Sequence, residues 1–129
     1  MSKEHLIKVT LLGLGNMGKN HLRILSMLKN VEVHYIYDIN QETLDVLSKQ
    51  YDVKATTDID QAMLGADAIV ICTPTSLHYD HFIMASKYAK SIFVEKPLAH
   101  SVEKARDIKE IAQNKNIFQG EPMYPLFWI

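Results

Sequence analysis

The stretch Gly13-Leu14-Gly15-Asn16-Met17-Gly18 stands between two segments of different periodicity. Residues 7–12 before it form a short apolar, β-rich run, which predicts a buried strand that stops at the first glycine. After it, Leu22, Leu25 and Leu28 recur at the spacing of one helical face. The stretch is therefore predicted to be a G-x-G-x-x-G turn that joins a strand to a helix.

Each glycine of this turn is expected to meet a different steric demand. Gly13 permits the tight turn, Gly15 lets the backbone approach a pyrophosphate, and Gly18 allows the helix to pack closely on the strand. The start of the helix, at Asn16 and Met17, offers backbone N–H groups and a positive dipole end to the phosphates. The motif predicts a dinucleotide site, with a purely structural turn as the alternative.

An acidic residue at the end of the second predicted strand strengthens the dinucleotide interpretation. Residues 31–37 are rich in β-branched and aromatic side chains and end at Asp38, which stands 20 residues after Gly18. At about this interval a carboxylate accepts hydrogen bonds from the adenosine ribose. The same carboxylate repels a 2′-phosphate, and Ile39 and Asn40 follow it where an arginine would favour NADP. NAD is therefore preferred over NADP, and the alternative for Asp38 is a solvated acid in a turn.

Strand and helix patterns alternate along the rest of the chain. Strands are expected at residues 7–12, 31–37, 53–55, 68–72, 91–94 and 117–119, and helices at 17–28, 41–51, 58–64, 78–88 and 102–114. Such alternation with short connections predicts right-handed βαβ units and a parallel sheet covered by helices on both faces. We expect one doubly wound, three-layer α/β domain, a Rossmann fold, over residues 1–120, followed by an apolar tail over residues 121–129.

Composition excludes several classes of partner. The chain has 129 residues, a net charge of −1 and 47% hydrophobic residues, so nothing electrostatic favours nucleic acid or an anionic membrane. No apolar run approaches the ~18 residues of a membrane span. The single cysteine, Cys72, rules out an internal disulfide and is typical of a reducing compartment. We expect a cytoplasmic protein without nucleic-acid or membrane partners.

Two further motifs carry a family resemblance. The first is Cys72-Thr73-Pro74-Thr75 followed by His78, and the second is Glu95-Lys96-Pro97-Leu98 at the end of a later strand. Together with the glycine turn they resemble the glucose–fructose oxidoreductase, inositol dehydrogenase and rhizopine-catabolism (Gfo/Idh/MocA) family over residues 6–119. The resemblance implies binding of NAD(H) or NADP(H) and hydride transfer at a hydroxyl carbon of a sugar, cyclitol or nucleotide sugar. Two stretches, Asn20-His21-Leu22-Arg23 and Pro74-Thr75-Ser76-Leu77-His78-Tyr79, most resemble the nucleotide-sugar 3-dehydrogenase branch.

The resemblance also implies roles for individual residues. The turn Thr73-Pro74-Thr75 would line the path of the dinucleotide towards the nicotinamide ribose, and His78 would position this loop and count among the cofactor-binding residues. Glu95 and Pro97 would lie at the nicotinamide end. Lys96 would be the catalytic residue, because a partly desolvated ammonium can bond the substrate hydroxyl that loses hydride and help to move its proton.

Other polar residues have less specific interpretations. His78 and His81 stand at i and i+3 on a predicted helix, but without a third ligand nearby in the sequence we expect no metal site. His81 is expected on the helix surface. Cys72 is expected to be a small buried hydrophobe. For His21 and Arg23, contact with the pyrophosphate and plain solvation both stay open.

The resemblance covers only one half of the expected active site. Members of the family carry further acid–base and substrate-binding groups in a second domain, and we expect this chain to be inactive alone. The apolar tail, residues 121–129, is expected to be the start of that domain and to pair two copies as a homodimer. A stand-alone nucleotide-binding or sensing module is the alternative. Methyl transfer from S-adenosylmethionine is a third reading, which leaves Glu95-Lys96-Pro97 unexplained.

Overall fold

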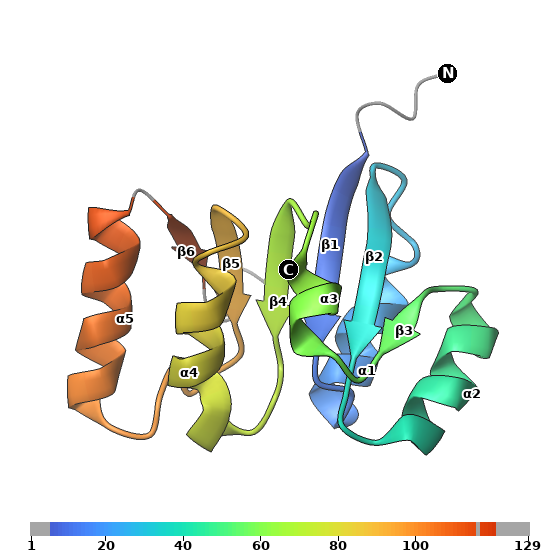
Figure 1. The fold of residues 1–129 in the computed structure, drawn as a ribbon, viewed down its shortest axis with the longest axis horizontal. Helices are drawn as coiled ribbons and strands as arrows, with labels where there is room; N and C mark the ends of the chain where they lie inside the picture. The colour runs from blue at the N-terminus through green and yellow to red at the C-terminus, as the bar shows by residue number, and fades with distance from the viewer. Residues whose placement is uncertain (1–5, 116, 121–129) are drawn as a thin grey trace.

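The computed structural model describes residues 6–115 and 117–120 and confirms the doubly wound α/β fold (Figure 1). Six parallel strands form one sheet in the order β3-β2-β1-β4-β5-β6. The strands are β1 (Ile7–Leu12), β2 (Val31–Tyr37), β3 (Ala55–Thr56), β4 (Ala68–Ile71), β5 (Ser91–Val94) and β6 (Phe118–Gly120). The helices are α1 (Asn16–Leu25), α2 (Gln41–Tyr51), α3 (Ile59–Met63), α4 (Thr75–Ala85) and α5 (Val102–Asn114).

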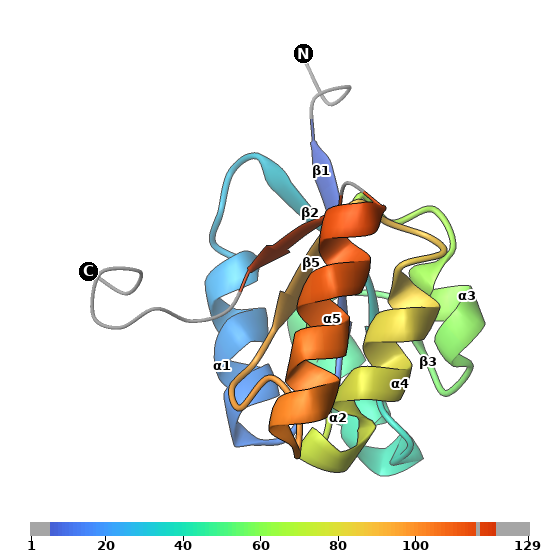
Figure 2. The same ribbon diagram turned by 90° about the vertical axis from the view of Figure 1, so that its left-hand side faces the viewer.

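Helices cover both faces of the sheet (Figure 2). The sheet separates the core into two clusters, one under each layer of helices. Leu22 of α1 and Leu44 of α2 pack with Leu11 and Ile36 on one face. On the other face α3, α4 and α5 cover the alternate strand residues, with Phe82 of α4 fully buried. The order of strands reverses direction between β1 and β4, so a crevice opens at the carboxyl ends of these two strands.

Helices α1 and α4 differ most from their predicted bounds, for local reasons. Helix α1 ends at Leu25, three residues early, because the Ser26 hydroxyl bonds the Arg23 carbonyl and a tighter turn follows. Helix α4 begins at Thr75, directly after Pro74, and not at residue 78. Proline is well tolerated at the start of a helix, so the turn after β4 is shorter than predicted.

In the part of the chain that the structure describes, each helix is too short or too polar to cross a membrane. The tail, residues 121–129, lies outside the described residues, and so do the expectations placed on it.

Candidate functional site

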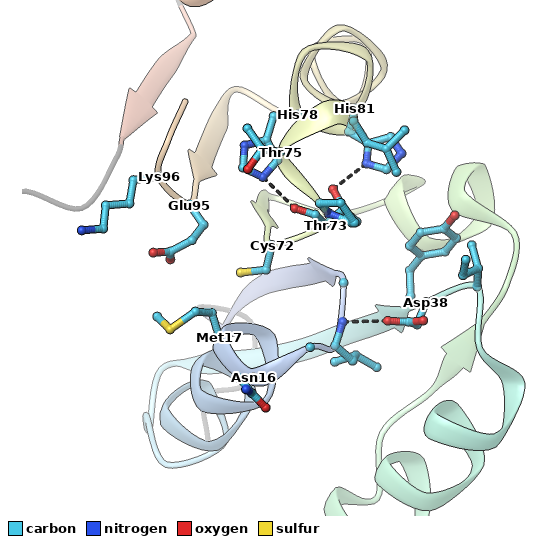
Figure 3. Close-up of a pocket in the computed structure, with 17 residues that line it drawn as sticks. Asn16, Met17, Asp38, Cys72, Thr73, Thr75, His78, His81, Glu95 and Lys96 are labelled. Carbon is cyan, nitrogen blue, oxygen red and sulfur yellow. Dashed lines mark hydrogen bonds between the residues drawn. The ribbon is translucent and has the colours of Figure 1, made fainter. Parts of the chain in front are cut away.

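A cleft of about 550 Å³ lies at the carboxyl ends of β1, β4 and β5. Its walls are the glycine turn, the end of β2 and the loops that follow β4 and β5. Apart from Gly18 and Pro97, every predicted site residue lines this cleft. Figure 3 shows that Asp38 lies at one end and Glu95 with Lys96 at the other. The fold therefore brings together the three motifs that the sequence keeps far apart.

The glycine turn fits the steric roles predicted for it. Gly13 has a φ of +96°, and a Cβ there would stand 2.6 Å from the backbone of Cys72. A Cβ on Gly18 would collide with the Gly13 carbonyl oxygen. Gly15 is different, because a Cβ there would meet no protein atom within 4 Å. Gly13 and Gly18 are thus required by the fold, whereas Gly15 leaves open space on the cleft side.

The start of α1 offers donors to a ligand. Gly15 is the N-cap residue, no side chain caps the helix, and its first turn contains no acidic residue. Asn16 and Met17 are exposed at this end of the helix. Because the first N–H groups of a helix have no partner within it, they fit an anion such as the pyrophosphate of a dinucleotide.

Asp38 does more than the sequence predicts. Its Oδ2 accepts a hydrogen bond from the Leu14 N–H at 2.8 Å, and its Oδ1 accepts one from the Asn40 N–H at 2.9 Å. The carboxylate therefore ties the glycine turn to the end of β2. Each carboxylate oxygen can accept a second bond, so the group can still meet the two ribose hydroxyls.

His78 and His81 both form hydrogen bonds with Thr73, the second residue after the end of β4. The His78 Nε2 atom lies 2.7 Å from the Thr73 carbonyl oxygen, and Nδ1 lies 2.8 Å from the Pro97 carbonyl oxygen. His78 thus holds the loops after β4 and β5 together, which agrees with a positioning role. Both imidazole rings line the cleft and form hydrogen bonds with other residues of its loops.

The expectation that His81 lies on the helix surface is wrong. Its side chain is buried, and Nδ1 forms a 2.8 Å hydrogen bond with the Thr73 hydroxyl. Burial lowers the pKa of His81, His78 lowers it further, and Asp80 opposes the shift. His78 and His81 lie on the buried face of α4 together with Phe82 and Ala85, which pack into the core. The neutral ring fits this position.

His21 is a functional candidate that sequence reasoning left undecided. It is buried and lies outside the lining of the cleft; its Nε2 is 2.9 Å from Glu95 Oε1, and its ring meets Phe93 edge-on. Arg23, by contrast, is exposed and bonds Asn20. One sequence signal could have predicted the burial of His21. It stands three residues after Gly18, the glycine expected to pack on the strand, and residues at this spacing lie on the same face of a helix.

His21, Cys72 and Glu95 place their nitrogen, sulfur and oxygen atoms within 4.8 Å of one another. These residue types can bind Zn²⁺, but the histidine and the carboxylate already bond each other. Burial raises the pKa of the Cys72 thiol to about 12, and Glu95 adds to the shift. The neutral thiol agrees with the expected role of Cys72 as a small hydrophobic side chain, but Cys72 is half-buried at the wall of the cleft and not fully buried as expected.

Lys96 differs from its expected environment. It follows β5, where the Glu95 N–H donates to the Ile71 carbonyl at 2.9 Å and extends the strand pairing by one residue. The Lys96 side chain is exposed at the edge of the cleft, so the expected desolvation is not found within the described residues. The Lys96–Pro97 peptide bond is cis.

Comparison with known proteins agrees with this geometry and confirms the resemblance drawn from the motifs. Residues 7–119 match the Gfo/Idh/MocA family, described as an oxidoreductase family with an NAD-binding Rossmann fold. Glucose-6-phosphate 3-dehydrogenase of Bacillus subtilis is 28% identical over 110 residues, which cover 85% of this chain and 31% of the relative. The scyllo-inositol 2-dehydrogenase (NAD(+)) of the same organism is 30% identical over 111 residues, covering 83% and 32%.

A solved structure shows the same fold. The crystal structure of GenD2 from gentamicin A biosynthesis in complex with NAD has a TM-score of 0.86 and 22% identity, covering 94% of this chain and 35% of that one. The chain therefore spans about a third of the length of the relatives named here, which are 31% and 32% covered.

Proposed function

We propose that this chain is the cofactor half of a sugar or cyclitol dehydrogenase. The premise is that the chain belongs to the Gfo/Idh/MocA oxidoreductase family, which has an NAD-binding Rossmann fold. The reaction would move a hydride between NAD and a hydroxyl carbon. One observation carries the proposal. Asp38 and the pair Glu95–Lys96 lie at opposite ends of a single cleft, with the start of α1 between them.

The cleft would hold the dinucleotide in one direction. Asp38 would bond the adenosine ribose, and the N–H groups at the start of α1 would bond the pyrophosphate. This arrangement leaves the opposite end, at Glu95, for the nicotinamide. Thr73, Pro74 and Thr75 line the intervening wall, where they can reach the nicotinamide ribose.

Lys96 is the proposed catalytic residue. NAD supplies the hydride acceptor when it is bound. The Lys96 ammonium would hydrogen-bond the substrate oxygen next to the reacting carbon, orient it, and help to move its proton. Glu95 and Pro97 would shape the nicotinamide end on either side of this lysine. Substrate cover at the open edge of the cleft would provide the desolvation that Lys96 lacks here.

Substrate class and assembly extend the proposal beyond the described residues. The relatives act, by their names, on a glucose phosphate and on an inositol, which supports a polyol substrate for the whole protein. A nucleotide sugar stays within the same proposal. We also propose a cytoplasmic protein whose residues 121–129 begin a second domain or pair two copies. Light scattering of the chain with and without these residues tests the homodimer.

Turnover tests the function. The protein that contains this chain together with a family second domain should reduce NAD+ with a sugar or cyclitol, and Lys96→Met should abolish that activity while NADH binding persists. The 129-residue chain alone should bind NADH without turnover. Binding without turnover by the two-domain protein, across sugars, cyclitols and nucleotide sugars, would favour a nucleotide-sensing module instead.

A further inference from the structure

His21 connects two parts of the cleft that are 74 residues apart in the sequence. It lies on α1, the helix whose start is the proposed pyrophosphate site, and it bonds Glu95, which follows β5. A carboxylate has no hydrogen to donate, so the Nε2–H of His21 is the donor and Glu95 Oε1 the acceptor. Both side chains are buried, and a hydrogen bond to a carboxylate is stronger there than in water.

The two partners differ in their access to a ligand. Glu95 lines the cleft, whereas His21 is not among the residues of the described part of the chain that line it. The His21 ring is held from the other side by its edge-on contact with Phe93, at 5.6 Å between centroids and 65° between planes. His21 is therefore placed to act on a ligand through Glu95.

Glu95 has a carboxylate oxygen beyond the one that His21 bonds. In Figure 3 the carboxylate lies between Lys96 and Cys72, at the end of the cleft opposite Asp38. A nicotinamide carries a carboxamide N–H donor and, when oxidised, a ring cation. A carboxylate oriented by one fixed hydrogen bond suits both, because its second oxygen can accept from the carboxamide while its charge faces the ring.

We infer that His21 is a positioning residue for the nicotinamide end of the site: its hydrogen bond orients the Glu95 carboxylate so that the second carboxylate oxygen meets the nicotinamide. The inference rests on the proposed function, since it needs the dinucleotide to lie with its nicotinamide at Glu95. It assigns α1 two tasks, with its first turn at the pyrophosphate and its second turn at the support of Glu95.

Comparison of NAD+ with ADP-ribose tests this role, because ADP-ribose shares the adenosine, pyrophosphate and ribose parts and lacks only the nicotinamide. Calorimetric titration of the wild-type chain should give several-fold tighter binding of NAD+. His21→Leu keeps most of the side-chain volume and removes the donor. Loss of one such hydrogen bond corresponds to a roughly 3- to 10-fold drop in NAD+ affinity, while ADP-ribose affinity should change less than about 2-fold.

His21→Gln is the matched control, since its amide N–H can replace the Nε2 donor and should restore most of the ratio between the two affinities. In a Glu95→Ala background, His21→Leu should cause no further drop in that ratio. If the leucine variant melts well below wild type, His21→Asn supplies the same comparison, because its shorter amide does not reach Glu95.

Two results would overturn the inference. One is an equal loss of NAD+ and ADP-ribose affinity in His21→Leu, which would mean that His21 supports the pyrophosphate turn or the fold alone. The other is an unchanged ratio in the leucine variant. Failure of the proposed function looks different. Without a dinucleotide site the wild-type chain would bind neither NAD+ nor ADP-ribose, and without hydride transfer the two-domain protein would bind NADH but turn over no substrate.

Discussion

Gly15→Ala and Gly18→Ala place the same methyl group in two opposite environments. At Gly15 the φ is −73°, and the added Cβ meets no protein atom within 4 Å. The substitution costs some N-cap preference and gains a similar amount from a less flexible unfolded chain, so the free energy of unfolding should change by less than about 1 kcal/mol. At Gly18 the Cβ collides with the Gly13 carbonyl, and overpacking of this kind costs about 1–3 kcal/mol or more.

Gly15→Ala, which should change the free energy of unfolding little, should have a large effect on the affinity for cofactor. A methyl group on Gly15 would occupy the space through which the phosphates approach the start of α1. Each lost hydrogen bond to a charged oxygen is worth about 1.5–3 kcal/mol, which corresponds to at least a roughly 10-fold weaker affinity for NADH.

Thermal denaturation and titration of NADH fluorescence measure the two effects on the same samples. Gly15→Ala should melt near wild type and bind NADH poorly, whereas Gly18→Ala should melt at a clearly lower temperature. Wild-type NADH affinity in a folded Gly15→Ala chain would refute the placement of the pyrophosphate at this turn.

Three further results are expected. Asp38→Ala should weaken NADH binding by about 1–3 kcal/mol, since the ribose hydroxyls lose their acceptor, and should reduce the preference for NADH over NADPH in fluorescence titrations. Tighter binding of NADPH than of NADH by the wild-type chain would contradict the NAD preference. Because burial raises the pKa of Cys72 to about 12, a thiol reagent at about pH 8 should react far more slowly with folded than with unfolded chain. Burial lowers the pKa of His81, so its contribution to stability should be complete above about pH 6.5 and shrink below it. His81→Gln should flatten that part of a pH–stability curve, and an unchanged curve would oppose this account.

Much of the fold was predictable because its signals are local. The alternation of strand and helix patterns predicts a parallel sheet, and strand order follows from right-handed connections. Gly13 and Gly18 could be assigned from spacing alone, since steric demands at a strand–turn–helix junction depend on neighbouring backbone. Asp38 was found in the same way, as the residue where β2 ends at the ligand edge of the sheet.

The sequence by itself thus determined the doubly wound fold, the glycine turn and the acid that we propose as the ribose acceptor. Only the tertiary structure decided what the histidines do. His21 bonds Glu95 across 74 residues, and His81 bonds the hydroxyl of Thr73 instead of facing solvent. The exposure of Lys96 was decided there too. Periodicity identifies which face of a helix is apolar, but the partner of a buried polar group depends on which strand end lies opposite it, and that exists only once the sheet has assembled.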